Sequence, residues 1–183
     1  MASILNVDKV RATGSTTDGI TVSSTGLVQT PNDNKGLFMV GLNSIMTGIP
    51  RNVTTVVQLT REDFDKDNYF NTSNYRYTPT VAGTYFFQGQ ITFQSVGAGD
   101  NIYAQTSVYK NGTNVGVTSV IAIQQGSGND TSVLCNGYID MNGSSDYVDL
   151  RGYIYNYTDA ASTNKFTGAS TNNMTYLSGY RVL

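Results

Sequence analysis

The stretch NYFNTSNYRYTPTVAGTYFFQGQITFQS, residues 68–95, decides the fold of this chain. In its second half, apolar residues share one parity and mostly polar residues share the other, with Phe86 as the exception. The apolar set is Tyr85, Phe87, Ile91 and Phe93. Side chains on a strand point alternately to opposite faces, so the pattern predicts a long strand over 83–95 with one face in a core.

A turn is expected immediately before this strand. Pro79 fixes φ and removes a backbone donor, and Gly83 gives the chain freedom where it reverses. Upstream of the turn, Phe70, Tyr75 and Tyr77 mark a second, aromatic-rich extended segment. Together the two segments predict two strands joined by a tight corner.

The remainder of the chain repeats short strand-like segments separated by turn residues. We expect strands near 36–44, 53–60, 68–79, 83–95, 101–110, 114–124, 131–141, 146–157 and 174–183. Asn111-Gly112 between apolar runs is the strongest hairpin signal. No long helical periodicity is present, so the pattern predicts an all-β, antiparallel sandwich.

Composition narrows the class of protein. Of the 183 residues only 13% are charged, against roughly 25% in an average soluble domain. The net charge of −2 argues against a nucleic-acid partner, which would require a basic face. No apolar run has the length needed for membrane insertion. The N-terminus lacks the apolar stretch of a signal peptide, so we expect synthesis in a host cytoplasm without secretory export.

The region around the long strand resembles the globular head of complement component one q, a jelly roll shared with the tumour-necrosis-factor superfamily. The sequence signature of that family has aromatic residues at fixed spacings, together with one Asn or Asp and one Gly. The matching positions are Asp65, Phe70, Tyr77, Gly83, Tyr85 and Phe87. Two positions depart: Leu59 replaces the first Phe, and Gly89 replaces the last aromatic residue.

Downstream segments extend the resemblance over 36–183. They are Val108–Gly112, Asp146–Leu150 and Leu177–Tyr180, in the family's order. The resemblance implies an antiparallel jelly-roll head that assembles as a homotrimer, with aromatic residues packed about the three-fold axis.

Residues 1–35 differ from the head and are predicted to be a separate, extended arm. Their short apolar runs between Gly, Ser and Thr could not bury much surface alone. The sequence SILNVDKVRATGSTTDGITVSSTGLV resembles the N-terminal segment of virion proteins of marine tailed bacteriophages, typically fibres. The resemblance implies attachment to other virion proteins, for which Ile4, Leu5 and Val7 are the candidate residues. A generic flexible tail is the alternative.

A row of tyrosines is predicted on the strand 146–157. Val148, Leu150 and Ile154 share the core parity, and the tyrosines lie on the other face with Arg151. The tyrosine row is Tyr153, Tyr155 and Tyr157. Aromatic rows of this kind favour an interface, so we assign the row to the trimer seam. A solvent-facing amphipathic surface is the alternative.

The densest acidic cluster, Asp63, Asp65 and Asp67, is the candidate metal site. Its spacing fails the EF-hand pattern, with Asn68 at the Gly position and Asn74 at the Glu position. We expect a solvated loop and no cofactor, with weakly bound calcium as the alternative. Asp65 also matches the family's Asn/Asp position, which favours a structural turn.

Residues that support catalysis are scarce. The chain has no histidine, and Glu62 is its only glutamate. Histidine is the usual general base and the commonest metal ligand, so its absence argues against an enzyme. The single cysteine, Cys135, shares parity with Val133 and Ile139 and is predicted to be buried.

These observations favour a non-enzymatic virion structural protein on the exterior of a phage particle. It would be a trimeric fibre, an appendage or a capsid-decorating protein, held by its arm. The alternative is a receptor-binding adhesin module that recognises a host-surface glycan or protein through Tyr-, Asn- and Ser-rich loops. A capsule-degrading enzyme is the least favoured class.

Overall fold

The structure is a computed structural model. It describes residues 9–10, 20–22, 25, 28–29, 35–94, 101–124, 130–156 and 164–182. The chain divides into two compact units, Met1–Lys35 and Gly36–Leu183, at the residue where the sequence analysis places its boundary.

The first unit contains three short strands, β1 (Lys9–Val10), β2 (Ile20–Val22) and β3 (Val28–Gln29). They form an antiparallel sheet in the order β1-β2-β3. Strands β2 and β3 each contain part of a short apolar run of the arm. The candidate attachment residues Ile4, Leu5 and Val7 lie outside the described residues.

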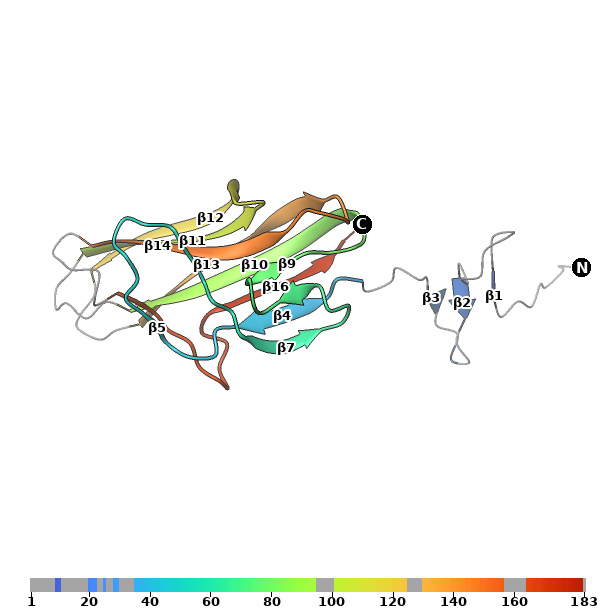
Figure 1. Cartoon of the computed structure of the whole chain (residues 1–183), viewed down its shortest axis with the longest axis horizontal. Helices are drawn as coiled ribbons and strands as arrows, with labels where there is room; N and C mark the ends of the chain where they lie inside the picture. Colours follow the sequence, from blue (N-terminus) through green and yellow to red (C-terminus); the bar gives the residue numbers. More distant parts are fainter. Residues whose placement is uncertain are drawn as a thin grey trace, which may run out of the picture. The chain divides into compact units, whose positions relative to one another are not determined.

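The second unit is a sandwich of two antiparallel sheets (Figure 1). The first sheet consists of β4 (Phe38–Gly41), β5 (Met46–Thr47), β7 (Arg61–Asp65), β10 (Gly83–Gln94), β13 (Asp130–Met141), β15 (Lys165–Phe166) and β16 (Tyr176–Arg181). The second consists of β6 (Thr55–Val56), β8 (Phe70–Asn71), β9 (Arg76–Tyr77), β11 (Asn101–Lys110), β12 (Thr113–Gln124) and β14 (Val148–Asn156). The described residues form no helix that could cross a membrane.

Strand β10 is the centre of the first sheet. It pairs with β13 along its whole length from Gly83 to Gln94, and with β16 and then β15 along its other edge. Strand β4 joins β16, and β7 joins β4. The second sheet has the order β12-β11-β14-β9-β8, with β6 also paired to β14. Neighbours in space are therefore distant in sequence, as in a jelly roll.

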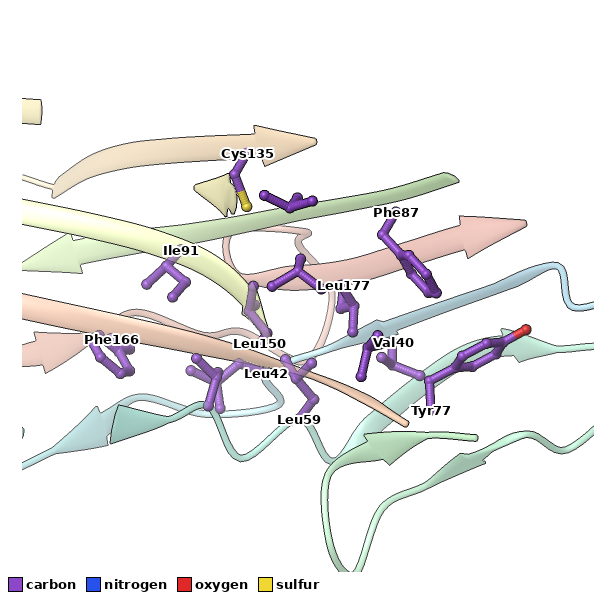
Figure 2. Packing of buried hydrophobic residues seen from close by; sticks show 14 of the residues in the cluster. Val40, Leu42, Leu59, Tyr77, Phe87, Ile91, Cys135, Leu150, Phe166 and Leu177 are labelled. Carbon is purple, nitrogen blue, oxygen red and sulfur yellow. The ribbon is translucent and has the colours of Figure 1, made fainter. Parts of the chain in front are cut away.

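The predicted alternation in β10 is confirmed. All four residues of its apolar set, Tyr85, Phe87, Ile91 and Phe93, are fully buried. Side chains from both sheets fill the space between them, among them Phe87 and Leu150 (Figure 2). The predicted hairpin is also confirmed: Asn111 (φ 50°) and Gly112 (φ 78°) join β11 to β12, and two positive φ angles are typical of a type I′ turn.

Two expectations about strands are wrong. Residues 68–79 are not one extended segment, because β8 and β9 pair with each other around a turn in which Tyr75 has a φ of 62°. The acidic segment 61–65 is the strand β7 and not a solvated loop. The sequence pattern missed β7 because its residues are mostly polar and only partly buried; the edge position of the strand allows this.

The aromatic signature residues meet at one end of the core. Tyr77 stacks on Phe38 with ring centroids 4.0 Å apart, and its hydroxyl donates a 2.9 Å hydrogen bond to the Gly36 carbonyl. Phe70 and Phe87 pack around the same pair, and Gly83 begins β10. Burial raises the pKa of Tyr77 far above its ordinary value, so this phenol remains a donor.

The two departures from the family pattern have structural reasons. Leu59 is fully buried, so an aliphatic side chain fills that part of the core. Gly89 faces the core in the middle of β10, and a Cβ placed there would lie 2.5 Å from Cδ1 of Leu150. Leu150 thus occupies the space that a larger residue at position 89 would need.

Replacing Gly89 with Ala should therefore destabilise the head. Overpacking a core costs about 1–3 kcal/mol, more than the fraction of a kcal/mol that Gly→Ala gains from the unfolded state. Shortening the opposing side chain in the double variant Gly89→Ala/Leu150→Val should recover part of the loss. Urea unfolding of the two single variants and the double variant measures the coupling, and strictly additive effects would contradict the contact.

Candidate functional site

The predicted calcium residues do not form a metal site in the structure. Asp63 lies on β7 and is paired with Arg61, with 2.8 Å between Oδ1 and Nε. Among the described residues, no three His, Cys, Asp or Glu side chains are grouped as metal ligands would be. The charge of Asp63 is thus already compensated by a neighbouring guanidinium.

The other two carboxylates bind backbone amides. Oδ2 of Asp65 accepts a 2.6 Å hydrogen bond from the Phe70 amide, and Oδ2 of Asp67 accepts one of 2.7 Å from the Gly36 amide. The second oxygen of Asp65 is buried without a hydrogen-bond partner. One spare oxygen falls far short of the roughly six to eight ligands that calcium takes. Asp65 closes the turn between β7 and β8, the structural role that the sequence predicted.

The outer face of the first sheet carries a surface that the sequence did not reveal. Phe86 on β10 lies directly opposite Tyr138 on β13 and Tyr180 on β16. The ring centroids are 5.4 Å apart for Phe86 and Tyr138, and 5.5 Å apart for Phe86 and Tyr180. Tyr138 is 66% exposed and Tyr180 is 45% exposed. Three aromatic side chains therefore form a continuous band across three adjacent strands at the surface.

Two further rows of cross-strand partners extend this band without adding a charge. We call the nine residues the aromatic face; they are Tyr138, Phe86, Tyr180, Asn136, Gln88, Ser178, Leu134, Gln90 and Tyr176. Gln88 donates a 2.6 Å hydrogen bond to the Tyr176 hydroxyl, which fixes both side chains. An uncharged face with exposed aromatic rings is typical of the buried centre of an interface.

The predicted tyrosine row lies on the outer face of the second sheet. Tyr153 and Tyr155 point away from the core, as their parity predicts, while Val148, Leu150 and Ile154 are buried. Tyr157 lies outside the described residues. Both described tyrosines are only partly exposed.

The partial exposure has a cause within the chain. The Tyr153 hydroxyl donates to Oδ1 of Asn52 at 3.2 Å, and the Tyr153 ring packs edge-on against Tyr103. The guanidinium carbon of Arg51 lies 5.0 Å from the centroid of the Tyr155 ring. The row therefore has intramolecular partners and a nearby cation. Its assignment to a trimer seam stays a prediction, and the aromatic face offers the more exposed and less charged surface.

Alternation alone could not have found the aromatic face. Phe86 interrupts the polar parity of β10, and that irregularity was the only signal in the sequence. Its partners Tyr138 and Tyr180 belong to strands far along the chain, so their register against β10 had to be known first.

Comparisons with known proteins support the fold. No protein-family model matches the chain, and a search of curated proteins finds no match. Among solved structures, the chain is similar to the globular domain of the zebrafish complement 1qA protein, with a TM-score of 0.51 and 12% sequence identity. The match covers 81% of this chain and 98% of that domain. At this identity the likeness shows the fold alone, and the predicted jelly roll is confirmed.

The single cysteine belongs to the core. Cys135 on β13 is 3% exposed, as its parity with Val133 and Ile139 predicts. Burial raises the pKa of its thiol to about 11, because the thiolate would lose its hydration. A thiol in this environment is neutral and inaccessible near neutral pH, and so is a poor nucleophile.

Native protein should therefore react very slowly with a thiol reagent. At pH 8 an unfolded cysteine is partly thiolate, whereas Cys135 becomes appreciably ionised only as the pH approaches about 11. We expect the labelling rate in native buffer to be at least about a hundred-fold below the rate in denaturant. Absorbance with an aromatic disulfide reagent measures both rates, and rapid labelling of the folded protein would contradict the burial.

Proposed function

We propose that this chain is a non-enzymatic structural protein whose jelly-roll head assembles into a homotrimer through the aromatic face. The observation that carries the proposal is the row of two exposed tyrosines, Tyr138 and Tyr180, on either side of the half-buried Phe86. The row lies on an outer face whose nine central positions bear no charge. Burying such a surface removes aromatic area from water and leaves no charge to desolvate.

A second apolar surface explains why the contact would close into a ring. Strand β12 is an edge strand of the second sheet, and Val115, Val120 and Ile121 on it are each more than a third exposed. Packing this edge on the aromatic face of another copy joins two different surfaces. Such a head-to-tail contact forms a closed ring when its rotation permits. The number three rests on the resemblance to the complement-one-q and tumour-necrosis-factor families.

The non-enzymatic assignment rests on the side chains that the chain offers. It has no histidine and one glutamate, and its cysteine lies in the core. Asp63 is paired with Arg61, and Asp65 and Asp67 accept hydrogen bonds from backbone amides. These three carboxylates and the thiol are engaged in holding the fold, which supports the assignment.

The virion assignment rests on the resemblance of residues 1–35 to phage appendage proteins. In this proposal the arm binds other virion proteins through Ile4, Leu5 and Val7, and the head lies on the exterior of the particle. The second candidate function is a receptor-binding adhesin module, favoured by the tyrosines and arginines on the outer face of the second sheet.

Light scattering tests the trimer. The full chain should have three times its monomer mass of 19.8 kDa. A single charge at a buried interface position, Tyr138→Asp or Tyr180→Asp, should weaken association by at least about ten-fold, because a carboxylate would have to be desolvated. Both side chains are well exposed in the single chain, so the fold should survive, which circular dichroism checks.

The matched variant Tyr153→Asp places the same charge on the row first predicted as the seam. It should leave the mass unchanged. A monomeric wild-type chain would contradict the trimer. A trimer dissociated by Tyr153→Asp but not by Tyr138→Asp would move the interface to the second sheet.

The virion assignment has its own test. Peptides of this chain should be found by mass spectrometry in purified particles of the phage that encodes it, at a copy number that is a multiple of three. Particles that lack the protein, although it is present in the lysate, would contradict a structural role in the virion.

A further inference from the structure

The second sheet differs from the rest of the molecule in its charge. Its six strands contain one acidic residue, Asp149, although the whole chain has 13 acidic residues. Asp149 is 1% exposed and is bound by Arg151 through two contacts, 2.6 Å from Nε to Oδ1 and 3.0 Å from Nη2 to Oδ2. The only carboxylate of the sheet is therefore covered and neutralised.

Three arginines lie over tyrosine rings on the outer face of this sheet. The guanidinium carbon is 3.9 Å from the ring centroid for Arg76 and Tyr147, 4.4 Å for Arg151 and Tyr109, and 5.0 Å for Arg51 and Tyr155. An arginine over an aromatic ring keeps its flat side on the ring, so its edge with the N–H donors remains directed elsewhere. Each of the three rings thus holds a guanidinium close to the outer face of the sheet.

Two of these guanidinium groups have no acidic partner within the part of the chain that the structure describes. Two other cations of the head are paired with carboxylates, Arg61 with Asp63 and Lys110 with Asp146. Among the described residues, neither Arg51 nor Arg76 forms an ion pair. Nε of Arg51 is buried and has no hydrogen-bond partner among the residues that the structure describes. In a chain of net charge −2, two oriented and uncompensated arginines on one face indicate a site for an anionic ligand.

We propose that the outer face of the second sheet binds an extended acidic glycan. Arg51 and Arg76 would bind carboxylates of the sugar chain, and the tyrosine rings between them would lie against the C–H faces of the sugars. Planar, two-point recognition of carboxylates is the chemistry in which arginine exceeds lysine. The inference deepens the second candidate function, the receptor-binding module, and rests on it.

The spacing of the two arginines sets the length of the ligand. Arg51 marks the Tyr155 end of β14, and Arg76 marks the Tyr147 end. Eight residue steps along a strand span about 26 Å, which corresponds to several sugar units. The surface between the ends carries phenol and amide groups; they belong to Tyr103, Gln105, Tyr109 and Tyr153.

This chemistry favours a glycan over the other anionic polymers. A nucleic acid requires many cations along its backbone, and this face has two that are uncompensated. An acidic peptide commonly adds to a sheet edge or enters a groove, whereas these groups lie on the face of the strands. Tyrosines with adaptable polar neighbours suit a ligand that presents many hydroxyl groups.

The test is binding of the full-length protein to oligogalacturonate, a sugar chain with a carboxylate on every unit, measured by isothermal titration calorimetry. We expect binding that weakens as salt is raised, and no binding to the same oligosaccharide with its carboxylates methyl-esterified. The double variant Arg51→Gln/Arg76→Gln should weaken binding at least ten-fold. The matched variant Lys66→Gln/Lys165→Gln removes the same charge away from this face and should bind as the wild type does.

Two further comparisons distinguish specific recognition of the glycan from nonspecific electrostatic attraction. Arg51→Lys/Arg76→Lys keeps the charge and should still weaken binding several-fold, and poly-glutamate of equal length should bind more weakly than the glycan. Absence of oligogalacturonate binding would overturn the proposal. Equal binding by the arginine-to-lysine variant, by the methyl ester or by poly-glutamate would also overturn it.

The outcome is independent of the trimer. The Tyr138→Asp variant leaves the second sheet unchanged, so a monomeric head should keep the single-site affinity and lose only the gain from multivalency. A protein that binds the glycan through Arg51 and Arg76 but is monomeric would contradict the proposed assembly and support this site. A trimer that does not bind the glycan would support the proposed assembly and contradict this site.

Discussion

The burial of one face of β10 is the constraint on which the rest of the head depends. This strand contributes four fully buried apolar side chains and is hydrogen-bonded along both edges, to β13 on one side and to β16 and β15 on the other. Since no intramolecular disulfide can form with one cysteine, the core must supply the stability of the monomer. Leu150 reaches across from the second sheet into the space left by Gly89, so the two sheets are fitted to each other at the middle of this strand.

With both inner faces committed to the core, the two outer faces are free to differ. One is uncharged and aromatic around Phe86; the other orients arginines on tyrosines along β14. An uncharged face suits contact with another copy, because its burial desolvates no ion. A face with oriented guanidinium groups suits a charged ligand. The sandwich thus allows assembly and recognition to use different surfaces of a small domain: the aromatic face and the β12 edge for assembly, and the outer face along β14 for recognition.

Much of the fold could be predicted because it follows from local rules. The alternation of apolar and polar residues located β10, β13 and β14 and predicted that Cys135 is buried. The dipeptide Asn111-Gly112 located the hairpin between β11 and β12. Prediction failed where tertiary contacts override the local pattern. The polar strand β7 forms because β4 offers it a partner, and the segment 68–79 folds back on itself because Asp65 binds the Phe70 amide and Tyr75 adopts a positive φ.

The sequence by itself determined which residues face inward and outward, because side-chain direction along a strand depends only on parity. It therefore placed Tyr153 and Tyr155 on an outer face and Tyr85 and Phe87 in the core. Only the tertiary structure decided which outward residues become neighbours. Phe86 meets Tyr138 and Tyr180, and Arg51 meets Tyr155, through pairings between segments far apart in the chain. Cross-strand register depends on the whole topology, and no local pattern specifies it.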